Sequence, residues 1–252
     1  MGDAEMNTVM IERPRGGRLA NLLNEFSAPR ATSVRDDFAD KSFRRAIVVG
    51  LVAYVVTRLC IIAGAGVRAA QRVVDVRKDI ESGIFDEIEP SAGSTISNVL
   101  TSWDGRWYLE IVRSGYPKSI PADITYNQLE ARAAFFPVYP WLVRVVDFVL
   151  PGGDTLAALF TNFVLGAISV VLVGLLARRL FNNAVAARSM TLYSVFPGSF
   201  VLSFAYAEAT FIVVAALCLL FLIEERWILA GIAAALGTGT RPNGVALVAA
   251  CI

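Results

Sequence analysis

The feature that most constrains this chain is the apolar run from Ala46 to Val67, which contains a single charged residue, Arg58. At ~1.5 Å per residue, a helix over this run is long enough to cross a hydrocarbon core of ~30 Å. A second run of the same kind extends from Leu156 to Ala177. A soluble helix of such length needs a polar face, and neither run has one. We therefore predict an all-α polytopic membrane protein.

Composition excludes several classes of function. The 252 residues are 56% hydrophobic and 18% charged, and a net charge of +1 gives no basic stripe for nucleic acid. The chain has no histidine, which removes Ser/His and Cys/His catalysis and the commonest metal ligand. Acid and base chemistry would therefore depend on carboxylates. Their spacing fits no metal site, and we expect neither a metal nor a cofactor.

The N-terminal half of the chain predicts an orientation in the membrane. Residues 1–45 mix eight basic with seven acidic residues and are interpreted as a mobile cytoplasmic tail. Lys41, Arg44 and Arg45 precede the first span, 46–67, and positive charge at a helix end favours the cytoplasmic side. Residues 68–155 would then form a large extracytoplasmic loop. Its basic residues do not contradict this, because long translocated segments escape the charge rule.

About four further transmembrane helices are expected over residues 156–252. Arg178 and Arg179 follow the second span where it should return to the cytoplasm. Residues 189–223 predict two short helices, with breaks at 196–198 (Phe-Pro-Gly) and 206–208 (Tyr-Ala-Glu). A fifth span starts near Trp227 and should be broken or kinked at 237–242. Because the sequence stops inside an apolar stretch, we expect a missing C-terminal portion and an incomplete bundle.

Four ionisable residues are assigned to the outer side by this topology. They are Arg58, Asp104, Glu208 and Arg241. A charge at membrane depth costs roughly 3 kcal/mol or more, so such residues usually have a function. Each also has a simpler explanation: Arg58 could snorkel or pair within a bundle, Glu208 could be a polar turn residue, and Arg241 could bind carbonyls freed beside a proline.

The segment 101–116 is the densest in polar and aromatic residues. Trp103 and Trp107 are four residues apart, so a short helix could place an aromatic face at the bilayer interface. Thr101 or Ser102 could cap its start and Gly115 could end it. Asp104 would lie in the first turn. There it could simply complement the helix dipole, or it could meet the head group of a lipid-borne substrate.

Several motifs together resemble the PIG-V-type mannosyltransferases, a family of GT-C polytopic glycosyltransferases. The matching segments are Trp103-Asp104-Gly105-Arg106-Trp107-Tyr108, Gly115-Tyr116, Phe135-Phe136-Pro137-Val138-Tyr139-Pro140, Phe196-Pro197-Gly198, Tyr206-Ala207-Glu208 and Thr240-Arg241-Pro242-Asn243-Gly244. The resemblance extends from about residue 45 to the end. It implies a GT-C-like helix bundle with a large first outer loop that contains interfacial helices and an acidic residue near the membrane.

The resemblance also implies a polyprenyl or dolichyl phosphate mannose donor, inverting transfer, and a glycan or glycolipid acceptor. Inverting transfer needs a base for the acceptor hydroxyl and a cation for the leaving phosphate. We assign Asp104 as the base and Arg241, then Arg58, as candidates for the phosphate. Glu208 could orient an acceptor hydroxyl or hold Arg241. The further candidate substrate-binding residues are Trp103, Arg106, Trp107 and Tyr108.

Two other functions are compatible with the same sequence. A polytopic transporter or flippase subunit would also contain broken helices and intramembrane charges, although its site should lie near the midplane. A noncatalytic subunit of a glycosylation complex is the third reading. Richness in Ala, Val and Arg indicates a GC-rich bacterium and its plasma membrane, and an endoplasmic reticulum protein would have a similar composition.

Overall fold

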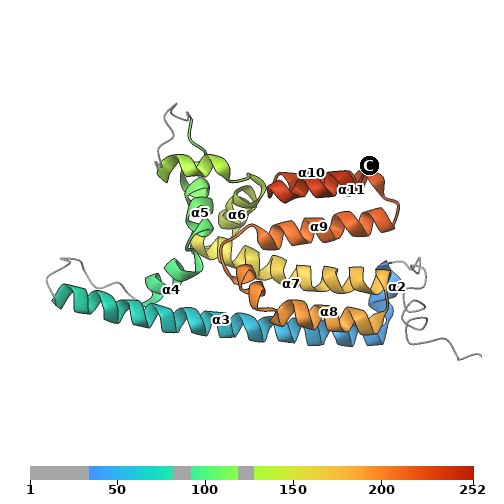
Figure 1. Ribbon diagram of the computed structural model, residues 1–252, viewed down its shortest axis with the longest axis horizontal. Helices are drawn as coiled ribbons and strands as arrows, with labels where there is room; N and C mark the ends of the chain where they lie inside the picture. The colour runs from blue at the N-terminus through green and yellow to red at the C-terminus, as the bar shows by residue number, and fades with distance from the viewer. Residues whose placement is uncertain (1–33, 82–91, 119–127) are drawn as a thin grey trace, which may run out of the picture.

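The computed structural model describes residues 34–81, 92–118 and 128–252, and this part of the chain contains helices and no strand (Figure 1). The predicted all-α class is therefore confirmed. In order, the elements are α2 (Val34–Ala39), α3 (Lys41–Glu81), α4 (Ala92–Leu100), α5 (Asp104–Ser114), η1 (Gln128–Ala134), α6 (Val138–Val149), α7 (Asp154–Leu180), α8 (Asn183–Val195), η2 (Pro197–Ser203), α9 (Glu208–Ile223), α10 (Trp227–Thr238), η3 (Pro242–Gly244) and α11 (Val245–Ala250).

Helix α3 is considerably longer than the span predicted over 46–67. Its 41 residues correspond to about 60 Å at ~1.5 Å per residue, about twice the thickness of a hydrocarbon core. The first part of the predicted outer loop, residues 68–81, therefore continues this helix. Residues 34–45 of the predicted tail are also helical, as α2 and the start of α3, and residues 1–33 lie outside the described residues.

Among the described residues, two helices are long and apolar enough to cross a membrane, α3 and α7. Helices η2 and α9 together could form a third, broken span, although they meet at a bend of 104°. Helix α10 is apolar but has only 12 residues. The structure thus supports two or three spans by length and composition, where the sequence predicts five.

The predicted helix breaks lie where the structure has them. Helix α8 ends at Val195, immediately before the Phe-Pro-Gly segment, and α9 begins at Glu208, the last residue of Tyr-Ala-Glu. Pro197 has no backbone N–H to donate and occupies the start of η2. The segment 204–207 between η2 and α9 is called the connector below. It turns the chain by the 104° bend and places Glu208 at the first turn of α9.

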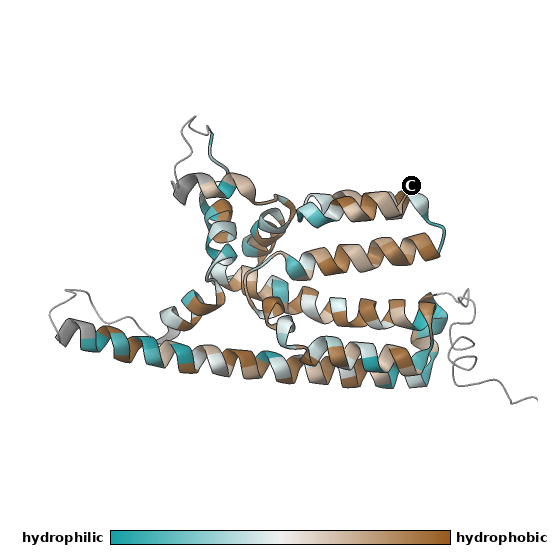
Figure 2. Ribbon diagram, in the orientation of Figure 1, coloured by the Kyte–Doolittle hydropathy of each residue, from teal (hydrophilic) through white to brown (hydrophobic). Residues whose placement is uncertain are grey.

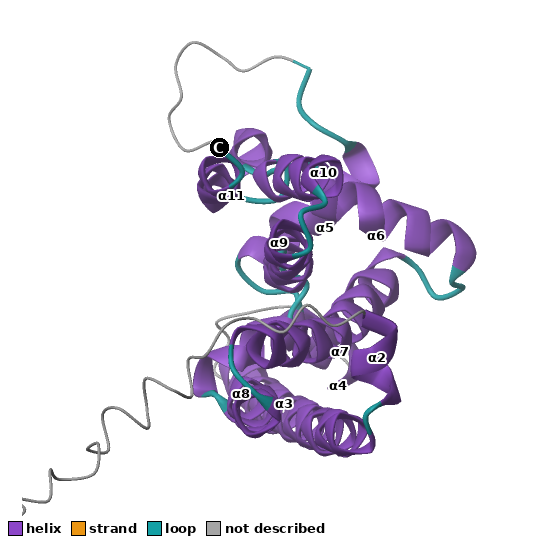
Figure 3. Ribbon diagram, turned by 90° about the vertical axis from the view of Figure 1, so that its right-hand side faces the viewer, coloured by secondary structure: helices purple, strands orange, loops and turns teal. Residues whose placement is uncertain are grey.

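The helices form two groups that meet along α7 and α9. Figure 3 shows α3, α7 and α8 on one side and α9, α10 and α11 on the other. Within the first group, Tyr54, Val170 and Met190 are fully buried. Gly50 packs against Met190, which leaves no room for a larger side chain at this helix contact. Small residues at such contacts let helix backbones approach closely in a membrane.

The predicted break in the fifth span is a reversal of the chain. Helix α10 ends at Thr238, and α11 packs back against it, so that Leu247 contacts Gly237. Gly244 makes this turn possible, because a Cβ there would lie only 2.2 Å from the backbone nitrogen of Thr238. The reversal brings Cys251 within 3.8 Å of Cys218 in α9.

A buried ionic network joins four helices at the C-terminal ends of α7 and α9. Asp37 of α2 is fully buried and binds Arg178 at 2.9 Å and Arg179 at 2.6 Å, both from α7. Arg178 also binds Asp40 at 3.0 Å, and Arg179 binds Glu224 at 3.4 Å. Figure 2 shows polar residues at this end of the bundle and apolar residues along the helices between its ends. The network therefore fixes α2 and α3 to α7 and α9.

Replacing Asp37 by alanine should destabilise the protein strongly. The change leaves the buried Arg179 guanidinium without its closest partner, and breaking a buried ion pair costs about 3–5 kcal/mol. Thermal unfolding in detergent measures the loss. The matched control is Asp36→Ala in the same short helix, where the side chain is exposed and the change should alter stability by about 0.5 kcal/mol or less. Equal stability of the two variants would contradict the account of this network.

Candidate active site

The candidate site lies at the end of the bundle opposite the Asp37 network. Here α5, α6, the first turn of α9 and the last turn of α10 come together (Figure 1). Glu208 and Glu224 mark the two ends of α9, and Asp154 and Arg179 mark the two ends of α7. The two polar regions are thus separated by about 40 Å of α7 at ~1.5 Å per residue. The site is consequently near one end of the spanning helices and away from their middle.

Asp104 is presented by an unusual helix start. The residue before it, Trp103, has a φ of 56° and a side chain that is 71% exposed. The predicted caps are wrong, because Thr101 and Ser102 donate their hydroxyls back to carbonyls of α4. Gly115 ends α5 with a φ of 73°, as predicted. The Asp104 carboxylate is exposed and forms no hydrogen bond or ion pair with any described residue, so it is available to a ligand.

Contacts at the other end of α5 fix its position. Arg144 of α6 donates to the carbonyl oxygens of Ile111 at 2.8 Å and Val112 at 2.9 Å. A cation at a helix C-terminus is favourable because it complements the helix dipole. Arg113 of α5 forms an ion pair with Asp154 at the start of α7. The helix that carries Asp104 is therefore attached to both α6 and α7.

The turn that carries Asp104 packs directly on the connector before Glu208. The backbone nitrogen of Ala205 donates to the carbonyl of Leu100 at 3.0 Å. A Cβ built at Gly105 would lie 3.4 Å from the Cβ of Ala205, so only a very small residue fits between the two segments. The Trp-Asp-Gly turn and the connector are thus in van der Waals contact, although they are about a hundred residues apart in the sequence.

Asn162 of α7 holds the connector, and sequence analysis did not single it out. Its side chain is fully buried and donates to the carbonyl oxygens of Phe204 and Tyr206, the latter at 2.8 Å. Carbonyls freed by a helix break need such partners inside a membrane. The sequence did contain a signal for this residue. Asn162 is a carboxamide within the apolar run 156–177, and a polar side chain at that depth is costly unless it has a hydrogen-bond partner.

Glu208 and Arg241 form an ion pair across the two helix breaks. Glu208 is the first residue of α9, where a carboxylate is favoured by the helix dipole. Arg241 is extended, with a φ of −154°, and lies in the turn between α10 and η3. The break predicted at 237–242 is therefore the feature that presents the guanidinium. Both side chains are partly exposed, at 23% and 31%, so the pair remains accessible.

Electrostatics join Asp104 to this ion pair. Burial raises the pKa of the Tyr108 phenol above its ordinary value, the Arg241 guanidinium opposes that rise, and Glu208 and Asp104 add to it. Asp104 also acts electrostatically on Arg241 itself. The contact of Gly105 with Ala205, three residues before Glu208, and the Glu208–Arg241 ion pair place these groups in one region. Three of the four ionisable residues predicted on one side are thus together.

Arg58, the fourth residue, is held elsewhere. Its guanidinium donates to the carbonyl oxygen and, at 2.7 Å, to the hydroxyl of Ser199 in η2, and it lies 4.9 Å from the centre of the Tyr54 ring. The described structure gives it no contact with Asp104 or Arg241. Arg58 therefore binds the freed backbone of η2, which corresponds to pairing within the bundle.

Aromatic side chains form one wall of the site. Tyr108 is buried and makes edge-on contacts with Phe135 and Tyr139, with ring centres 5.0 and 4.9 Å apart. Trp107 lies 6.4 Å from Phe135 and is half-buried. Arg106 is exposed on the same helix. Tyr108 therefore adjoins the ion-pair region and Trp107 packs near Phe135, whereas the exposed Trp103 ring points into the surroundings.

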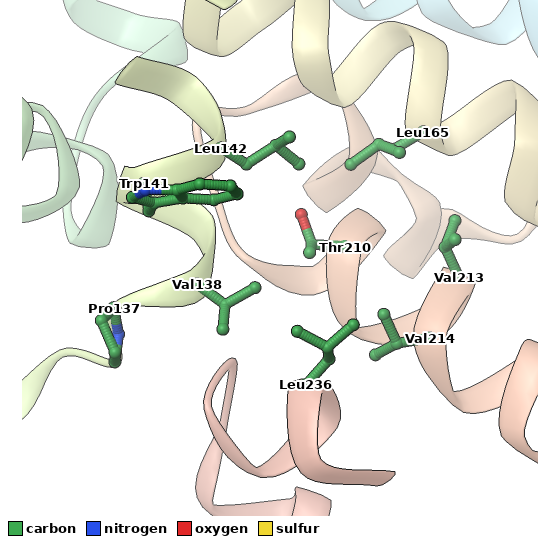
Figure 4. A pocket seen from close by; sticks show the side chains of 9 residues that line it. All are labelled: Pro137, Val138, Trp141, Leu142, Leu165, Thr210, Val213, Val214 and Leu236. Carbon is green, nitrogen blue, oxygen red and sulfur yellow. The ribbon is translucent and has the colours of Figure 1, made fainter. Parts of the chain in front are cut away.

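An apolar pocket of about 380 Å³ lies between α6, α7, α9 and α10 (Figure 4). It is lined by Pro137, Val138, Trp141, Leu142, Leu165, Thr210, Val213, Val214 and Leu236. Thr210 lies one helical half-turn after Glu208, and the Val138 nitrogen donates to the Gly239 carbonyl at 3.1 Å, two residues before Arg241. The Thr210 hydroxyl is buried and has no hydrogen-bond partner among the described residues. The surface of the pocket is apolar, so it suits an apolar chain.

No group of three or more cysteine, aspartate or glutamate side chains in the described part of the chain could hold a metal ion. The chemistry available at the site is that of the Asp104 carboxylate, the Glu208–Arg241 pair and the tyrosines around them.

The C-terminal half of the chain matches one known protein family. Residues 133–252 match the model of the family described as dolichyl-phosphate-mannose-protein mannosyltransferase. The matched region includes Glu208, Arg241 and the apolar pocket, and it excludes Asp104. No curated protein and no solved structure gave a significant match. This half of the chain is thus similar to a GT-C-like mannosyltransferase family, and the match does not name the PIG-V type.

Replacing Asn162 by leucine should loosen the connector. The variant loses two hydrogen bonds to the carbonyls of Phe204 and Tyr206, each worth about 1 kcal/mol. Amide hydrogen exchange of Ala205 should therefore accelerate roughly tenfold or more. The control is Thr161→Val, because the Thr161 hydroxyl bonds only to its own helix at Ala157. Unchanged protection of Ala205 in the leucine variant would show that Asn162 does not hold this segment.

Proposed function

We propose that the protein is a membrane mannosyltransferase of the GT-C type. It transfers a mannosyl residue from a polyprenyl or dolichyl phosphate donor to a glycan or glycolipid acceptor with inversion. The observation that carries the proposal is the association of an unpaired carboxylate, Asp104, with the Glu208–Arg241 pair beside an apolar pocket. The family similarity of residues 133–252 supports the same chemistry. The motif at 103–108 favours a PIG-V-type enzyme within that class.

The proposed reaction is a single displacement at the anomeric carbon. Asp104 accepts the proton of the acceptor hydroxyl while its oxygen forms the new bond to carbon. The bond from that carbon to the phosphate oxygen breaks, and the polyprenyl phosphate leaves with the electron pair. Arg241 donates hydrogen bonds to the leaving phosphate, since a guanidinium matches phosphate oxygens with paired donors. Each step uses a group at the site, and no metal is required.

Glu208 positions Arg241 in this proposal. The ion pair fixes one edge of the guanidinium, which has five N–H donors, and leaves others for phosphate. The apolar pocket would take the first isoprenoid units of the donor, and Trp107 and Tyr108 would contact its sugar. Arg58 is no longer a phosphate candidate, because its contacts are with η2.

The position of the site favours an enzyme over a transporter. A transporter site is expected near the midplane, where it is reached alternately from either side. The Asp104 region instead lies at one end of α7 and α9, where a lipid head group would meet water. We propose the plasma membrane of a bacterium as the compartment, with an endoplasmic reticulum membrane as the eukaryotic equivalent. The site would face the extracytoplasmic side.

Replacing Asp104 by asparagine should abolish most of the activity. Membranes that contain the protein are given radiolabelled polyprenyl phosphate mannose, and transfer of label to endogenous acceptors is followed. Loss of a general base lowers the rate by about 10²–10⁴-fold, while the fold should be unchanged because the side chain is exposed. Glu110→Gln on the same helix is the matched control and should retain activity. Equal transfer of label by the wild type and the Asp104→Asn variant would contradict the proposed mechanism.

Replacing Glu208 by glutamine should act through Arg241. The neutral amide no longer fixes the guanidinium, so donor binding should weaken and the KM for the donor should rise about tenfold, with a smaller effect on kcat. Arg241→Gln should lower kcat by about 10²–10³-fold, as expected for a group that stabilises developing charge. Steady-state kinetics with varied donor separates the two effects. A larger decrease in kcat for Glu208→Gln than for Arg241→Gln would show that Glu208, and not Arg241, acts on the developing charge.

A further inference from the structure

A second pocket lies at the N-terminal end of α3, far from the candidate active site. It has a volume of about 520 Å³ and is open to the surroundings. Its lining residues are Lys41, Arg44, Arg45, Val48 and Val49. Three basic side chains therefore adjoin two apolar ones on a single shallow surface.

These residues occupy one face of the helix. Their spacing of three, four, seven and eight residues is that of one helical stripe. The opposite face contains Phe43, Gly50 and Tyr54, which are buried against the bundle. The pocket is consequently on the outer side of α3, where a membrane lipid can reach it.

The positive charges in this pocket are not neutralised within the described residues. Lys41, Arg44 and Arg45 are exposed, and none forms an ion pair with another described side chain. The nearby Arg178 and Arg179 are, in contrast, both paired with acidic residues of the buried network. Three unpaired cations in one shallow site attract an anion, and an anionic group there would gain about 1 kcal/mol per basic residue.

The same face continues as an apolar strip. Beyond the two valines, Val52, Val56 and Leu59 follow the stripe and are exposed, at 56%, 52% and 60%. Because α3 is long and apolar enough to cross a membrane, this strip faces lipid chains. The three basic residues therefore lie at the level of the lipid head groups, and the exposed apolar strip next to them can contact an acyl chain.

We propose that this pocket binds an anionic phospholipid. The phosphate of its head group lies against Lys41, Arg44 and Arg45, and one acyl chain lies along Val48 and Val49. The apolar part of the lining favours a lipid over free phosphate, since inorganic phosphate would gain nothing from the valines. The site is at the opposite end of the bundle from Asp104, so the proposal is independent of the enzymatic function.

Lipid binding to the purified chain tests the proposal directly. Native mass spectrometry in detergent measures retention of phosphatidylglycerol against phosphatidylcholine with the same acyl chains. We expect phosphatidylglycerol to be retained preferentially. The triple variant Lys41→Gln, Arg44→Gln, Arg45→Gln should bind it roughly a hundredfold more weakly, at about 1 kcal/mol for each lost charge. The matched control Arg68→Gln, Arg72→Gln, Lys78→Gln removes three charges from the other half of α3 and should bind normally.

Four results would overturn the proposal. Equal retention of the two lipids, or equal loss in both triple variants, would show that no specific head-group site exists. Displacement of phosphatidylglycerol by millimolar inorganic phosphate would identify a soluble anion as the occupant. Carbodiimide cross-links from Lys41 to acidic residues within 1–33, together with absent lipid binding, would assign the pocket to the N-terminal segment of the chain. Circular dichroism of each variant verifies that its helices are retained.

Discussion

Backbone groups cannot be left unpaired inside a membrane, and this constraint governs the arrangement of the whole site. The chain breaks its helical hydrogen bonding between η2 and α9, which frees carbonyls at Ser199, Phe204 and Tyr206. Arg58 donates a hydrogen bond to the first carbonyl, and Asn162 donates to the other two. Side chains from α3 and α7 thereby determine where the connector runs. These two buried polar residues of the spanning helices stabilise a bend, and the bend in turn determines the position of Glu208.

The bend has consequences for chemistry because three segments meet at it. The connector packs on the Trp-Asp-Gly turn at Gly105, which brings Asp104 near the start of α9. The second break, at the end of α10, supplies Arg241 to Glu208. A carboxylate, an ion pair and an apolar pocket are therefore assembled from elements that are distant in the sequence. Such an arrangement suits a substrate whose reactive phosphate joins a sugar to a lipid.

Sequence analysis predicted the features that depend on local chemistry. Proline and glycine ended helices where expected. Asp104, Glu208 and Arg241 were predicted on one side from five assumed spans, and the structure brings the three together although it supports only two or three spans by length and composition. Sequence analysis could not find partners that exist only after packing. Nothing local distinguishes an arginine that binds phosphate from Arg58, which binds a carbonyl. The helix begins at Asp104 as expected, but its N-cap was mispredicted, since the hydroxyls of Thr101 and Ser102 bond to α4 instead.

The central claim, that the Asp104 turn touches the connector before Glu208, is tested most directly by a disulfide between residues 105 and 205. The two Cβ positions lie 3.4 Å apart, close to the separation in natural disulfides. With Cys60, Cys218 and Cys251 replaced by serine, the pair Gly105→Cys and Ala205→Cys is oxidised in native membranes and digested. The account predicts a linked peptide in high yield. Its absence, with both cysteines remaining free for alkylation, would contradict the site as described.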